Sequence, residues 1–118
     1  MKYKFINTEY LETLLSGGDV GIISELVVIF REQIEEIASE MKSLNAKGNY
    51  TSLAMLAHKA KSSVAIMGMT DLAIMLKTFE LEGREGTNKE NYNSYIMRFE
   101  TETRQAVEEL ENYINNLK

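Results

Sequence analysis

The sequence predicts an all-α fold, an antiparallel four-helix bundle with a short additional N-terminal helix. The 118 residues contain no proline; because proline costs about 3 kcal/mol inside a helix, its absence suits long uninterrupted helices. The segment 89–117 repeats apolar residues at heptad spacing, which is typical of a helix packed in a left-handed bundle. The breaks between segments are a few residues long, so consecutive helices are expected to lie antiparallel.

Five helical segments are expected along the chain, and they form a single domain over residues 1–118. Glycines mark most of the breaks, including Gly48, Gly68, Gly83 and Gly86. Short polar side chains precede the segments and are expected to accept hydrogen bonds from the first helical turn. The segments are 8–16 (capped by Asn7 or Thr8), 20–46 (Asp19), 50–67 (Asn49), 71–83 (Thr70) and 89–117.

Apolar residues at spacings of three and four define one face of each long segment, and these faces are the expected core. In 20–46 they are Ile23, Leu26, Val27, Phe30, Ile34, Ile37, Met41 and Leu44. In 50–67 they are Leu53, Leu56, Ala57, Ala60, Val64 and Met67, and in 71–83 they are Leu72, Met75, Leu76 and Phe79. In 89–117 they are Tyr92, Ile96, Phe99, Thr103, Ala106, Leu110, Tyr113 and Leu117.

Composition excludes several classes of function. The formal net charge of −5 argues against nucleic-acid binding, which needs clustered lysine and arginine to neutralise phosphates. The absence of cysteine excludes a disulfide framework and a thiolate metal site. No signal peptide or transmembrane segment is recognised, so the expected location is the cytoplasm, with no contact to a membrane.

His58 is the only histidine in the chain, and imidazole is a competent neutral nucleophile near pH 7. At about 100° per residue, His58 lies about 150° from the centre of the core face of its helix. A core histidine is therefore disfavoured. An incidental surface histidine remains the alternative reading.

The neighbours of His58 favour an interaction site. Its own face carries small residues one turn away, where a solvent-exposed helix usually has long charged side chains; they are Ala54, Ser62 and Ala65. Met55 and Ile66 lie beside this face and Met69 follows in the turn, so an apolar rim is expected around the exposed imidazole.

Lys61 lies one turn after His58 and about 60° around the helix, so its ammonium can reach an anion attached to the imidazole. Lys59 points away from this face. Metal binding is not expected, because one histidine without cysteine or a carboxylate cluster lacks ligands. A Ser-His-Asp hydrolase is also disfavoured, because no nucleophile turn or oxyanion hole is recognisable.

His58-Lys59-Ala60-Lys61-Ser62-Ser63, with Val64 and then Gly68 ten residues after the histidine, resembles the histidine-containing phosphotransfer (HPt) domain family. That pattern is roughly His-x-x-Lys-Gly-small-small-x-x-x-Gly, and the chain departs from it at Ser62, where the family usually has glycine. The resemblance implies that His58 is the phosphoacceptor, Lys61 stabilises the phosphate and Gly68 makes the turn into the next helix. It also places Glu80 and Arg84 at positions that can lie beside the histidine; for Glu80 a surface glutamate is the favoured reading, because a carboxylate repels a phosphoryl group.

The implied function is a phosphorelay step between receiver domains, one on a hybrid sensor histidine kinase and one on a response regulator. The chain would be a phosphoryl carrier, often monomeric in this family, without the ATP-binding features of a kinase. It would need no cofactor of its own, since the Mg²⁺ belongs to the receiver. The competing reading is a helical adaptor, or a degenerate HPt domain that binds receivers without accepting phosphate.

Two isoleucines lie beyond the core face of the segment 20–46. Ile22 and Ile29 are seven residues apart, so they lie on one line along the helix. We expect Ile22 to contact the short first helix and Ile29 to belong to the docking surface for a receiver.

Overall fold

The computed structural model describes residues 5–6 and 20–117, without the side chains of residues 20, 22, 23 and 117. Over this part the chain is all-helical. It contains four α-helices, α2 (Val20–Ala46), α3 (Tyr50–Ile66), α4 (Thr70–Glu85) and α5 (Tyr92–Leu117), with a 3₁₀ turn at Lys89–Asn91 before α5. The predicted helix over 8–16, the Asp19 cap and the predicted contact of Ile22 lie outside the described residues.

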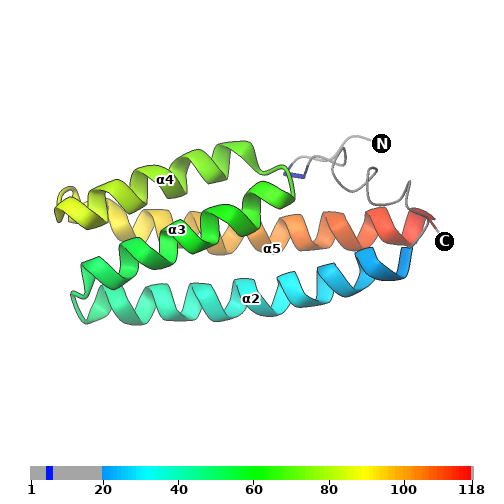
Figure 1. Ribbon diagram of the computed structural model, residues 1–118, viewed down its shortest axis with the longest axis horizontal. Coiled ribbons are helices and arrows are strands. Elements are labelled where there is room, and N and C mark those ends of the chain that lie inside the picture. Colours follow the sequence, from blue (N-terminus) through cyan, green and yellow to red (C-terminus); the bar gives the residue numbers. More distant parts are fainter. Residues whose placement is uncertain (1–4, 7–19, 118) are drawn as a thin grey trace.

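The four helices lie side by side along the long axis of the molecule (Figure 1), whose extents are 46 × 21 × 20 Å. Side-chain pairs between α2 and α5 show which parts of the two helices lie next to each other. Arg31, near the middle of α2, pairs with Glu111; Lys42, further along α2, pairs with Glu100, and Asn45 near the end of α2 contacts Asn93. Successive residues of α2 from Arg31 onward therefore lie beside successively earlier residues of α5.

The predicted boundaries hold to within three residues, and local capping accounts for the start of α3 and the end of α4. Asn49 accepts a hydrogen bond from the Ser52 amide at 3.4 Å, as predicted for a helix N-cap. Thr70 is not a cap: α4 begins at Thr70, and Met69 occupies the cap position without a side-chain hydrogen bond. The side chain at this cap position is buried, since Met69 is 3% exposed.

Gly83 does not end α4, contrary to the sequence prediction. The helix continues to Glu85, and Gly86 ends it in the left-handed conformation with φ 68°, which favours glycine because it has no Cβ. Gly68 has φ 75° in the turn between α3 and α4, and the Met69 amide bonds back to the Val64 carbonyl at 3.1 Å. The reversal that brings α4 alongside α3 therefore depends on Gly68.

The predicted apolar faces form the core except at Leu26, Leu44 and Tyr113, and the side chains of Ile23 and Leu117 lie outside the described residues. Leu26 is 40% exposed; it lies on the rim of a groove between α2 and α3. Tyr113 is only partly buried, while Val107 and Ile114 join the core. A strict seven-residue repeat drifts by about 20° per heptad relative to a straight α-helix, so the residues after the predicted ones face inward late in α5.

Candidate functional site around His58

The imidazole of His58 stands on the surface of α3, and its side chain is 57% exposed. The opposite face of α3, including Leu53, Ala60 and Val64, is fully buried. His58 Nδ1 lies 3.0 Å from Oε1 of Glu80 on α4, so the ring is oriented by the neighbouring helix. His58 is therefore neither a core histidine nor an unsupported surface residue.

Glu80 is the buried centre of this site, with only 5% of the residue exposed. Three basic side chains surround its carboxylate. Oε1 contacts His58 and lies 3.8 Å from Lys61 Nζ, and Oε2 lies 2.6 Å from a terminal nitrogen of Arg84. The sequence-based reading of Glu80 as a surface glutamate is wrong, because α4 turns this residue towards α3.

The environment of Glu80 favours the ionised form. Burial raises the pKa of its carboxyl and is the largest single influence. The hydrogen bond from His58 and the charges of Arg84, His58 and Lys61 together outweigh burial and leave the pKa of Glu80 below its ordinary value. Since paired carboxylates stay charged at neutral pH, Glu80 is a permanent hydrogen-bond acceptor there.

An ionised carboxylate decides the tautomer of the neutral imidazole. Because Glu80 can only accept, His58 Nδ1 must carry the proton in their 3.0 Å contact. The lone pair then lies on Nε2, to which no described residue donates a hydrogen bond. His58 can thus act as a nucleophile through Nε2 while its other nitrogen is held.

Close approach of α3 and α4 brings these residues together, and it depends on Gly83. A Cβ placed on Gly83 would lie 3.0 Å from the Cβ of Ala54 and 3.4 Å from the Tyr50 carbonyl oxygen. Ala54 is consequently fully buried. Its predicted place on the docking surface is wrong: the α4 backbone covers it, which the periodicity of α3 alone cannot indicate.

The remaining predicted neighbours of His58 differ in their exposure to solvent. Ser62 and Ala65 are exposed and small, so little stands beside the imidazole on its solvent side. Met55 and Ile66 are exposed at 65% and 51%, as expected for an apolar rim. Met69 is not part of that rim, because its side chain is buried beneath the turn in the core.

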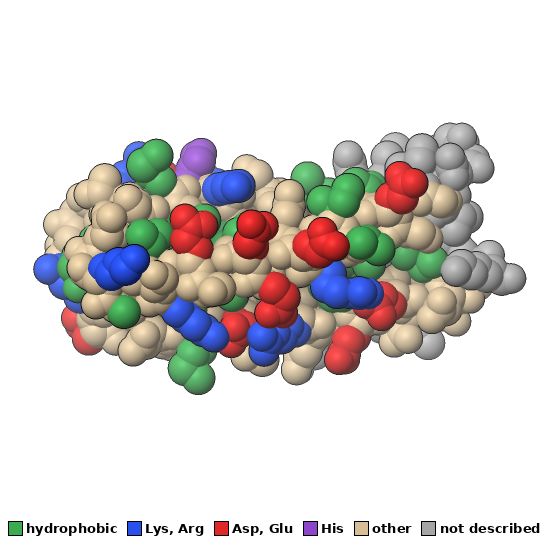
Figure 2. Space-filling view, turned by 90° about the horizontal axis from the view of Figure 1, so that it is seen from below, with side chains coloured by type: hydrophobic (Ala, Val, Ile, Leu, Met, Phe, Trp, Pro, Cys, Tyr) green, Lys and Arg blue, Asp and Glu red, His purple; other side chains and the backbone are tan. Residues whose placement is uncertain are grey.

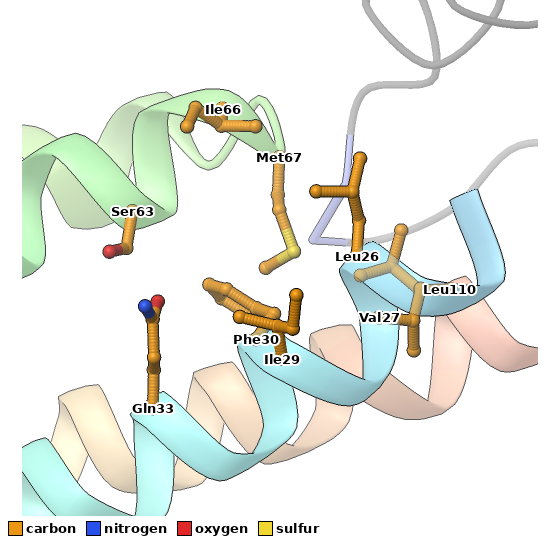
Figure 3. Close-up of a pocket in the computed structure, with 9 residues that line it drawn as sticks. All are labelled: Leu26, Val27, Ile29, Phe30, Gln33, Ser63, Ile66, Met67 and Leu110. Atoms are coloured by element: carbon orange, nitrogen blue, oxygen red, sulfur yellow. The ribbon is translucent and has the colours of Figure 1, made fainter. Parts of the chain in front are cut away.

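An apolar groove of about 240 Å³ lies between α2 and α3, further along α3 than His58. Figure 3 shows Ile66 and Met67 on one side and residues of α2 on the other, with Ser63 opposite Gln33. Ile29 is 51% exposed at this groove. Leu26 also lines the groove. Its periodicity predicts a place in the core, because periodicity cannot show where two helices diverge.

The surface elsewhere differs from this groove. Figure 2 shows acidic and basic side chains intermingled across one face of the molecule, and several form ion pairs between α2 and α5. Among the described residues there is no group of three or more histidine, cysteine, aspartate or glutamate side chains that could hold a metal ion. None of the described helices is both long and apolar enough to cross a membrane.

No family model, curated protein or solved structure matches this chain.

Proposed function

We propose that the protein is a phosphoryl carrier of the HPt type, with an antiparallel four-helix bundle as its fold. His58 accepts a phosphoryl group from the aspartyl phosphate of one receiver domain and passes it to the aspartate of another. The observation that carries the proposal is the exposed imidazole of His58, held at Nδ1 by Glu80 and open at Nε2. The order of the pairs along α2 and α5 supports the antiparallel arrangement.

The surroundings of His58 suit transfer between proteins. A loose phosphoryl-transfer transition state gains mainly from positioning and from cations near the transferring group. Lys61 is one turn from His58 and its ammonium is only loosely placed, 3.8 Å from Glu80, so it can turn to the phosphoryl oxygens. The receiver contributes its Mg²⁺, and this chain contributes the nucleophile, without a kinase activity or a cofactor of its own.

The docking surface for the receiver comprises the small residues beside His58 and the apolar groove. Ser62 and Ala65 allow close approach, and Ile29 and Ile66 present exposed apolar area on α2 and α3. Exposed apolar side chains next to an exposed polar group are typical of protein interaction sites. We propose a cytoplasmic monomer whose partners are receiver domains of a hybrid sensor kinase and a response regulator.

A second candidate is a domain that binds receivers without accepting phosphate. One specific observation favours it: the negative charge of Glu80 lies 3.0 Å from the ring that would carry the phosphoryl group, and like charges repel. Arg84 and Lys61 also pair with Glu80, which reduces that repulsion. We therefore favour the carrier.

The test is transfer from a panel of receiver domains that have been phosphorylated with radiolabelled acetyl phosphate. The wild-type chain should acquire acid-labile, base-stable phosphate. His58→Gln should acquire none while keeping its helical circular dichroism and melting temperature. Ile29→Glu should weaken labelling without loss of stability, whereas Ile74→Glu, a matched change on exposed α4 surface, should not. Label on the His58→Gln protein, or receiver binding without any label on the wild type, would contradict the carrier.

A further inference from the structure

The feature that the proposed function leaves unexplained is the charge of Glu80. A neutral amide could accept the same hydrogen bond from His58 Nδ1, yet the chain has a carboxylate there, buried and in contact with three basic side chains. Burying a charge is unfavourable unless it is paired. A charge retained beside the reacting ring therefore points to a state in which the ring itself is positive.

We propose that Glu80, which holds the proton of His58 on Nδ1 before transfer, becomes the counter-ion of the positively charged ring while Nε2 carries the phosphoryl group. This inference rests on the proposed function, since it concerns the phosphorylated form of His58. Its structural basis is the 3.0 Å contact of Oε1 with Nδ1 and the burial of the carboxylate.

The transfer step balances without moving a proton. The Nε2 lone pair forms the N–P bond as the P–O bond of the aspartyl phosphate breaks, and that electron pair leaves with the aspartate carboxylate. Nδ1 keeps its hydrogen, so the ring becomes a cation bonded to the phosphoryl group. The cation lies against the Glu80 carboxylate, and a charge-assisted hydrogen bond there is about twice as strong as a neutral one. Transfer to the second receiver reverses each change.

Arg84 and Lys61 lie at different distances from the Glu80 carboxylate, and their roles differ accordingly. On α4, Arg84 lies 2.6 Å from Oε2 of Glu80 and fixes the carboxylate in place. On α3, Lys61 lies 3.8 Å from Oε1, beyond hydrogen-bond distance, and it is the cation free to follow the phosphoryl group. Among the described residues of α2 and α5, no charged side chain forms an ion pair with His58 or Glu80.

The experiment uses the full chain, labelled with ¹⁵N and phosphorylated directly with phosphoramidate, so that no receiver is needed. Nitrogen chemical shifts of the His58 ring report the site of phosphorylation and the proton on Nδ1 as the pH is raised. Glu80→Gln preserves the shape and removes the charge. Glu85→Gln removes a charge from exposed surface on the same helix and is the matched control.

In the wild type, phosphate is expected on Nε2, and the phosphorylated ring should keep its Nδ1 proton to a pH about one unit higher than in Glu80→Gln, which is tenfold in the protonation equilibrium. Glu85→Gln should behave as the wild type. Equal titration of wild type and Glu80→Gln, phosphate on Nδ1, or no labelling of His58 would each overturn the inference.

The unphosphorylated protein provides a second measurement in case Glu80→Gln is poorly folded. At a pH where the ring is neutral, wild-type shifts should show the proton on Nδ1; a proton on Nε2 would overturn the inference without any variant. Failure of receivers to label the chain, with the phosphoramidate results as expected, would reject the proposed function and leave the role of Glu80 in place. The two failures are thus distinguishable.

Discussion

The α2–α5 and α3–α4 helix pairs both carry ion pairs between helices, but the environments of the two sets differ. Between α2 and α5, Arg31 pairs with Glu111 and Arg104 with Glu35, and all four side chains are between 43% and 54% exposed. Between α3 and α4, the Glu80 side chain is 7% exposed and has three basic neighbours. The first set lies in solvent, and the second is a buried charge held by its surroundings.

The carboxylates of the two sets show the same contrast in their pKa values. The pKa of Glu35 is lowered chiefly by its hydrogen bond with Arg104. For Glu80, burial is the largest influence and raises the pKa, and the hydrogen bond with His58 together with the charges of Arg84, His58 and Lys61 lowers it below the ordinary value. Exposed pairs contribute little to stability, whereas removing one partner of a buried pair is costly. The comparison indicates that the two exposed α2–α5 pairs contribute little to stability, whereas the α3–α4 cluster depends on each partner of its buried carboxylate.

The largest effect is expected from separating α3 and α4. In Gly83→Val, the new side chain would meet Ala54 and the Tyr50 carbonyl, since even a Cβ lies 3.0 Å from the Ala54 Cβ. Overpacking of this kind lowers the free energy of unfolding by about 1–3 kcal/mol, and displacement of Glu80 should also reduce labelling by receivers. Urea unfolding measures the first and transfer the second. Lys77→Val, on the exposed face of α4, is the control; equal losses in the two variants would mean that the close approach is unimportant.

Removing the ammonium of Lys61 is expected to slow phosphoryl transfer about tenfold. Lys61→Ala removes the ammonium near the phosphoryl group, and a single such cation contributes about 1–2 kcal/mol to the barrier, or roughly tenfold in rate. Single-turnover transfer at saturating receiver measures it. Lys59→Ala removes a charge from the other side of the same helix and should transfer at the wild-type rate. An unchanged rate for Lys61→Ala would show that the lysine only pairs with Glu80.

A smaller effect is expected from Glu80→Gln on the free energy of unfolding at acid pH. Because the pKa of Glu80 is lowered in the folded protein from an ordinary value of 4.5, its contribution to stability is fully present above that value and is lost as the pH falls through the folded pKa. Wild type should therefore be more stable than Glu80→Gln at pH 5.5, and the difference should narrow below about pH 4.5. Urea unfolding between pH 3 and 5.5 measures it; a difference that stays constant would show that the carboxylate is not paired in solution.

The smallest effect is expected from the α2–α5 ion pairs. Arg31→Gln breaks the pair with Glu111; the side chains of Arg31 and Glu111 are 51% and 43% exposed. The variant should change the free energy of unfolding by less than about 1 kcal/mol and should not affect transfer. High salt should also leave the wild type nearly unchanged if these pairs contribute little. A loss as large as that of Gly83→Val would reverse the comparison between the two helix pairs.

Local patterns in the sequence determined the helices, most of the core and the exposure of His58. Apolar spacing defined the inward faces from Phe30 to Leu110, and Asn49 capped its helix as predicted. These features depend on neighbours within one or two turns, so they are readable from one segment at a time. The same arithmetic placed His58 opposite the core face of α3, as observed.

Only the tertiary structure decided which side of each helix its neighbour covers. Ala54 and Ser62 lie equally near His58 around α3, yet Ala54 is buried because the α4 backbone passes over it at Gly83, and Ser62 is exposed. For the same reason Glu80 is buried against His58, while Leu26 stands at the rim of a groove. Periodicity gives the angular position of a residue around its own helix, but the approach and divergence of two helices depend on residues far apart in the chain.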